Sequence, residues 1–132
     1  MAVNKPQVQC RVRVTRGGDI ALGPGKMELL AAIGAAGSIS GAARAMQMSY
    51  RRAWLLVETM NSCFLTPLVE TATGGRAGGG AQLTAEGQKV LEGYQAMLRD
   101  VEQVAQQHLG KLLKNSPLAP ETVGDKVSDE SN

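Results

Sequence analysis

The stretch from Ala85 to Lys114 limits what this chain can fold into more than any other feature of the sequence. Its composition predicts one long helix with Thr84 as the N-cap, although Gly93 and Gly110 weaken it. A helix of that length spans about 45 Å, more than the rest of so small a domain can cover. A heptad-like seam runs along it and consists of Leu91, Tyr94, Leu98, Val101, Ala105, His108 and Leu112. We expect this seam to form the interface of a homodimer, with His108 as an interface residue rather than a ligand.

A helix-turn-helix pattern is predicted in the middle of the chain. Residues 26–36 are rich in helix formers, and Gly37 is placed to end that helix. Ser38 then caps a slim, alanine-rich helix, "QM" forms the connection, and Ser49 caps a third helix. The small side chains of the second helix allow another helix to cross it closely. In this motif the last helix lies in the major groove of DNA.

The third helix begins with an aromatic and two basic side chains, Tyr50, Arg51 and Arg52. The positive end of a helix dipole disfavours arginine, so we interpret both arginines as groups that meet a negative partner, DNA. Ordinary exposed surface residues are the alternative interpretation. Arg44 on the preceding helix is expected to contact phosphate. The apolar stripe that should pack on the first two helices consists of Ala53, Val57 and Met60, with Trp54 beside them.

The N-terminal region predicts strands. Residues 8–14 alternate strictly between apolar and polar side chains, which is typical of a half-buried strand. Gly17 and Gly18 then form a turn, and "DIAL" is expected to be a short return strand.

A second hairpin is predicted after the third helix, because Leu68-Val69 and Gln82-Leu83 flank the glycine-rich loop "GGRAGGG". The loop lacks the lysine and Ser/Thr that would follow in a phosphate-binding P-loop, and the spacing of a dinucleotide fingerprint is absent. Glycines permit close approach to a phosphate backbone or minor groove, and Arg76 supplies a positive charge there. We therefore interpret the hairpin as a wing.

Charge is distributed unevenly along the chain. Up to residue 84 there are nine basic against four acidic side chains, and after it five against eight, so formal charges of +5 and −3 make up the chain's +2. A basic front half favours a polyanionic partner. A solvated charged surface is the plain alternative, and charge alone does not decide between them.

The composition also argues against several classes of protein. No apolar run is long enough for a membrane helix and no signal-peptide pattern opens the chain, so a cytoplasmic location is expected. Cys10 and Cys63 are far apart, match no metal spacing and are interpreted as buried reduced thiols. No nucleophile–base pair, metal cluster or cofactor motif is visible, so we expect no catalytic or metal-binding residue and no enzyme.

Four stretches of the sequence, "GSISGAARAMQMSYRRAW", "MN", "PLVETATGGRAGGGAQLT" and "EGQKVLEGY", together resemble the N-terminal DNA-binding domain of the ModE family of molybdate-responsive regulators. The resemblance runs from about Gly23 to about Leu113. It implies a winged helix-turn-helix related to the LysR group, and a homodimer joined through the long last helix. It also implies an inverted-repeat operator near genes for molybdate uptake or molybdoenzymes. Carried over residue by residue, it assigns DNA contacts to Ser38, Ser40, Ser49, Tyr50, Arg51, Arg52, Thr73, Gly74, Gly75 and Arg76.

Full-length regulators of that family continue into small β-barrel domains that bind molybdate or tungstate, and this sequence has no residues for them after the long helix. We therefore expect no cofactor. The predicted fold class is mainly α with a small β-hairpin, a winged helix-turn-helix with a long C-terminal dimerisation helix. The predicted parts are an N-terminal strand or hairpin (1–22), the DNA-binding domain (23–84), the dimerisation helix (85–114) and a disordered tail (115–132).

The leading functional prediction is a dimeric, sequence-specific DNA-binding regulator of transcription. One alternative is an interaction module that heterodimerises with a full-length regulator through the long helix. Another is a small oxyanion sensor, because wing glycines can bind an anion through their backbone N–H groups, although DNA phosphate is the simpler occupant.

Overall fold

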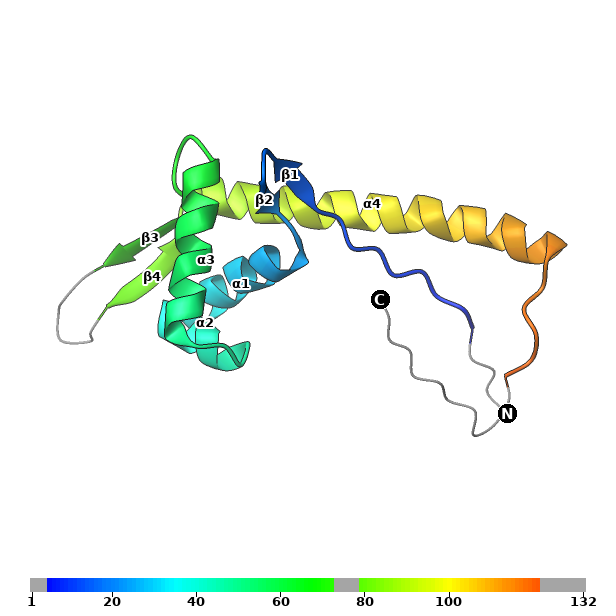
Figure 1. The fold of residues 1–132 in the computed structure, drawn as a ribbon, viewed down its shortest axis with the longest axis horizontal. Helices are drawn as coiled ribbons and strands as arrows, with labels where there is room; N and C mark the ends of the chain where they lie inside the picture. Colours follow the sequence, from blue (N-terminus) through cyan, green and yellow to red (C-terminus); the bar gives the residue numbers. More distant parts are fainter. Residues whose placement is uncertain (1–4, 73–78, 122–132) are drawn as a thin grey trace.

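A computed structural model describes residues 5–72 and 79–121. Four helices and two separate two-stranded antiparallel sheets make up the described chain (Figure 1). The predicted fold class, mainly helical with a small hairpin and a long last helix, is confirmed. In chain order the elements are β1 (Val14–Arg16), β2 (Asp19–Leu22), α1 (Pro24–Ala36), α2 (Ile39–Ala45), α3 (Tyr50–Cys63), β3 (Val69–Ala72), β4 (Gly80–Leu83) and α4 (Ala85–Asn115).

The helices begin and end where their local sequence predicts. Ser38, Ser49 and Thr84 each accept a hydrogen bond from the backbone N–H three residues on, at 2.9 Å, 3.0 Å and 2.9 Å. Gly37 ends α1 in the left-handed conformation, with φ 76°, and its N–H donates to the Ile33 carbonyl oxygen. These polar contacts satisfy helix-end groups that would otherwise depend on water alone.

The hydrophobic core lies where α1 meets the other helices. Leu29, Leu30 and Ile33 of α1 are fully buried, as is Met60 of α3. The same core cluster contains alanines of α2 and α3, namely Ala42, Ala43 and Ala53. Small side chains at a crossing let two helix backbones approach closely, so the slim second helix predicted from the sequence serves the packing of the whole motif.

The β3–β4 hairpin is anchored to α3 by one side chain. Asn61 accepts backbone hydrogen bonds from Leu68 at 2.8 Å and Val69 at 3.2 Å, and it donates one to the Val69 carbonyl oxygen at 3.1 Å. On the other strand, the Ala81 N–H donates to the Gly37 carbonyl oxygen at 3.0 Å. The hairpin is thus held by Asn61 of α3 and by Gly37 at the α1–α2 junction. These two contacts set its direction relative to α3.

The long helix α4 belongs to the domain for only part of its length. Gly87, Leu91 and Tyr94 are buried, whereas Val101, Val104 and Leu112 are exposed. Figure 1 shows α4 extending well beyond the other helices. Among the described residues, no helix combines the length and the apolar character needed to cross a membrane.

Leu91 and Tyr94 require a correction, because the predicted seam gave both to a partner molecule. The structure buries them inside this chain, with only 7% and 5% of their surface exposed. The Tyr94 hydroxyl also donates to the Val12 carbonyl oxygen at 2.8 Å. Helix periodicity identifies an apolar face but not which neighbour covers it, and here α1 and the N-terminal segment cover its first part.

The predicted strand over residues 8–14 is also wrong in extent. Pairing starts only at Val14, which lies opposite Leu22, and the register shifts between Val14 and Thr15. The partner strand β2 ends at Leu22, directly before α1, so residues 8–13 find no strand beside them in the described chain and run as an extended segment (Figure 1). The "DIAL" return strand is confirmed as β2.

The packing of α4 predicts opposite effects for two glycine substitutions in the same helix. A Cβ atom at Gly87 would overlap with the Leu68 carbonyl oxygen, whereas a Cβ atom at Gly93 would meet nothing. We expect Gly87→Ala to lower the free energy of unfolding by about 2 kcal/mol or more. Gly93→Ala should raise it by up to about 1 kcal/mol through helix propensity. Denaturant unfolding of both variants measures this, and equal effects would contradict the described seating of α4.

Candidate nucleic-acid interface

The connection between α2 and α3 is a tight turn with defined geometry. Gln47 adopts a positive φ of 57°, and the Met48 N–H donates to the Ala43 carbonyl oxygen at 3.0 Å. A non-glycine residue rarely adopts this conformation, so the surrounding contacts hold it there. The turn brings Ser49 into position as the cap of α3, and the two helices form the predicted helix-turn-helix arrangement.

The first turn of α3 carries positive charge without a compensating acid. Tyr50, Arg51 and Arg52 are all exposed, and the first turn contains no acidic side chain. Among the described residues, neither arginine forms an ion pair. The guanidinium groups therefore add to the positive end of the helix dipole instead of being neutralised within the chain. Such a turn favours a negatively charged partner.

Two hollows flank α3, and they divide the predicted site residues between them. Ser49, Arg51 and Arg52 line one of them, together with Leu55 and Thr59. Ser38, Ser40 and Tyr50 line the other, which lies between the start of α2, α3 and the hairpin. Arg44 lines neither and is exposed in the last turn of α2. Thr73, Gly74, Gly75 and Arg76 lie outside the described residues.

Sequence reasoning missed six residues that line the second hollow: Ile39, Trp54, Thr71, Ala72, Gly79 and Gly80. Trp54 was expected beside the core stripe, and 40% of its surface is exposed. The buried positions of α3 are Ala53, Val57 and Met60, and the next residue after Ala53 lies about 100° round the helix from it. The spacing could have revealed this, since Tyr50 and Trp54 are four residues apart and share one face.

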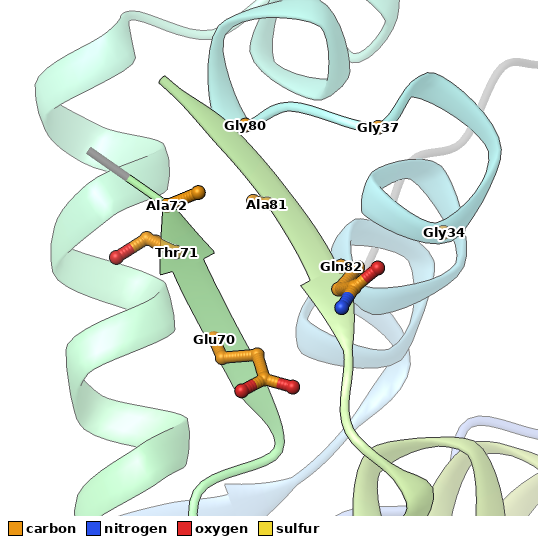
Figure 2. Close-up of a pocket in the computed structure, with 8 residues that line it drawn as sticks. All are labelled: Gly34, Gly37, Glu70, Thr71, Ala72, Gly80, Ala81 and Gln82. Carbon is orange, nitrogen blue, oxygen red and sulfur yellow. The ribbon is translucent and has the colours of Figure 1, made fainter. Parts of the chain in front are cut away.

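A third hollow lies between the end of α1 and the hairpin (Figure 2). Gly34, Gly37, Gly80 and other residues line it, and Glu70 is the one charged side chain among the described lining residues. In Figure 2 the Thr71 side chain points to the opposite side of the strand from Glu70, toward α3. Within the described ranges, no group of three or more His, Cys, Asp or Glu side chains is placed to hold a metal ion.

Comparison with known proteins points to one family. Residues 25–88 match the bacterial regulatory helix-turn-helix proteins of the lysR family. The chain is 49% identical over 76 residues to the molybdenum-pterin-binding protein MopB of Rhodobacter capsulatus. The aligned region covers 58% of this chain and 28% of MopB. It is 42% identical over 82 residues to the DNA-binding transcriptional dual regulator ModE of Escherichia coli (strain K12). That alignment covers 62% of this chain and 31% of ModE.

A solved structure of full-length CbnR complexed with its target DNA resembles the fold with a TM-score of 0.48 and 19% identity, over 63% of this chain and 27% of that one. In MopB and ModE, the region that matches this chain spans about a third of the relative's length.

The capping of α3 yields a stability prediction. Ser49→Ala removes the acceptor for the Arg52 N–H and should lower the free energy of unfolding by about 1 kcal/mol, whereas Ser49→Asp should preserve it. Ser62→Ala is the control, because this exposed hydroxyl donates only to the Thr59 carbonyl oxygen near the other end of the helix. Thermal unfolding of the three variants would refute the capping role if Ser49→Ala were as stable as Ser62→Ala.

Proposed function

We propose, from the match of residues 25–88 to the bacterial regulatory helix-turn-helix proteins of the lysR family, that this chain is a homodimeric, sequence-specific DNA-binding regulator of transcription rather than an enzyme. The observation that carries the proposal is the first turn of α3, capped, exposed and basic, with no acid in it. In a helix-turn-helix protein this end of the recognition helix faces the base edges and phosphates of the major groove.

The proposed contacts fall into two groups. Arg44, Arg76 and the N-terminal ends of the helices hold phosphates and set the register of the protein on the duplex. Tyr50, Arg51 and Arg52 read or flank base edges in the major groove. Thr73, Gly74 and Gly75 of the wing approach the neighbouring backbone or minor groove, where the lack of side chains on the glycines permits close contact.

The proposed dimer forms along the part of α4 that leaves the domain. The side chains of this part that follow the corrected seam are Leu98, Val101, Ala105, His108 and Leu112, widened by the exposed Val104. Two recognition helices must sit about 34 Å apart to enter successive major grooves on one side of a duplex. A two-fold dimer therefore favours an inverted-repeat operator.

The relatives suggest which genes the protein controls. One is named a molybdenum transport protein, ModE of Azotobacter vinelandii, and others carry molybdenum-pterin-binding names. We propose that this chain regulates genes of molybdate uptake or of molybdoenzymes, from the cytoplasm. An oxyanion site is less well supported in the described part of the chain, because Glu70 is the one charged group among the described residues that line the hollow beside α1, and its carboxylate repels molybdate.

A second candidate function also draws on α4. Val101, Val104 and Leu112 are exposed large apolar side chains on a helix that projects from the domain. These positions would equally pair with the matching helix of a longer regulator, which would make the chain an interaction module. A purified protein that is a stable homodimer and binds duplex DNA alone removes the need for this alternative.

The DNA-binding role is tested with a duplex selected by the purified protein from a random pool, with and without molybdate. We expect Arg51→Ala/Arg52→Ala to fold with unchanged or slightly raised thermal stability, because the repulsion between the arginines and the helix dipole is removed. Its affinity should fall, and the slope of log affinity against log salt should become shallower by about one for each phosphate that the variant no longer neutralises. Equal binding by wild type and double variant at every salt concentration would exclude the role of this turn.

The dimer is tested by placing a charge on each side of α4. Val101→Asp puts a carboxylate into the proposed seam and should shift the protein to monomer, with a loss of affinity for the selected duplex. Gln103→Asp adds the same charge on the opposite side of the helix and should leave the dimer intact. Light scattering coupled to size exclusion gives the mass. If both variants remain dimers, the interface lies elsewhere.

A further inference from the structure

The hollow between α2, α3 and the hairpin contains an exposed aromatic pair. The proposed contacts give no role to Trp54, one of the two. Trp54 and Tyr50 are 40% and 55% exposed and both line it. We propose that Trp54, beside the base-flanking Tyr50, forms an uncharged seat for the deoxyribose–phosphate backbone of one DNA strand. This inference rests on the proposed DNA-binding function and adds a contact residue of a different chemical kind.

The exposure of Trp54 is not a consequence of poor packing. The neighbouring Ala53, Val57 and Met60 are at most 4% exposed, so α3 fills the core without the indole. Tryptophan is the largest apolar side chain, and leaving much of it in water costs free energy that a bound partner recovers. The exposed indole beside a cationic helix turn is therefore suited to contact a binding partner.

The lining of the hollow determines which partner fits. Its polar side-chain groups include the hydroxyls of Ser38, Ser40 and Thr71, which come from two separate parts of the fold, and none of the described lining residues is charged. Ser38 Oγ lies 3.5 Å from Ser40 Oγ and also accepts from the Gly41 N–H at 2.9 Å. Hydroxyls and an indole N–H donate to phosphate oxygens, whereas the aromatic faces suit the C–H surface of a deoxyribose.

Bases are a poorer match for this surface. In an intact duplex the faces of the bases are stacked on one another, so an aromatic platform cannot stack on them without opening the helix. The sugar rings of the backbone are exposed along both grooves and need no such opening. The indole of Trp54 therefore suits the backbone better than it suits a base.

The position of the hollow agrees with that occupant. It lies on the flank of α3 that faces the hairpin, at Thr71, Ala72 and Gly79. When α3 enters a major groove and the hairpin reaches the adjacent minor groove, the backbone of the strand between the two grooves passes over this flank. The other flank carries Arg51 and Arg52, so charge and apolar contact are separated on the two sides of one helix.

The chain offers a direct probe of the seat, since Trp54 is its only tryptophan. Emission excited selectively from tryptophan is recorded while the wild-type protein is titrated with the pool-selected duplex and with a scrambled duplex. We expect a change in emission with both duplexes, and protection of the indole from quenching by acrylamide. This measurement needs no substitution and is independent of whether a variant folds.

The variants separate a seat for the backbone from a reader of bases. Trp54→Ala should weaken binding to both duplexes by the same factor, about tenfold, because the apolar surface that covers the backbone is removed wherever the backbone runs. Trp54→Phe should stay within about threefold of wild type, since it keeps an aromatic face. Leu65→Ala, just beyond the far end of α3 and fully exposed, is the control and should bind as wild type.

Salt dependence distinguishes this seat from the arginines. The indole releases no counterion, so Trp54→Ala should have the salt slope of wild type, whereas Arg51→Ala/Arg52→Ala should not. The inference is overturned if Trp54 emission and quenching are unchanged at saturating duplex and Trp54→Ala binds normally. A loss confined to the selected duplex would overturn the backbone assignment. A protein that binds no duplex would overturn the proposed function itself.

Discussion

The backbone of Leu68 is the point on which the rest of this structure depends. Its N–H donates to Asn61 of α3, and its carbonyl oxygen accepts from the Thr84 N–H at 2.9 Å. Gly87 of α4 packs against the same peptide so closely that no Cβ fits between them. The recognition helix, the hairpin and the long helix therefore meet at one fully buried residue. Neither hairpin direction nor α4 direction can change without breaking a contact made there.

The two ends of the domain follow different physical rules. Around α1 the structure maximises stability, with complete burial of large aliphatic side chains and alanines at the helix crossings. The start of α3 instead holds residues that lower stability. Arg51 and Arg52 lie at the positive end of a helix, and the side chains of Trp54 and Tyr50 are exposed. These locally unfavourable choices become favourable only when a polyanion covers them, which is why we assign the binding surface to this end.

Local signals in the sequence predicted local structure well. Ser38, Ser49 and Thr84 were identified as caps and Gly37 as a helix end, because each of these effects depends on residues within one turn. The resemblance to a ModE-type DNA-binding domain is likewise confirmed. Errors arose where a distant segment decides the outcome. Residues 8–13 lack a strand partner in the described chain because β2 is short, and Leu91 and Tyr94 are covered by α1 and the N-terminal segment. The DNA contacts themselves stay predictions, those of the wing tip among them.

A rigid helix as the proposed dimer element has a consequence for specificity. A flexible linker would let two recognition helices adapt to many half-site spacings, and would contribute mainly through effective concentration. A continuous α4 that is seated against Leu68 instead gives each recognition helix a fixed orientation relative to the proposed dimer axis. Only operators with one spacing then satisfy both helices at once. In the proposed dimer, discrimination between operators is therefore limited by how firmly Gly87 holds α4 against the hairpin.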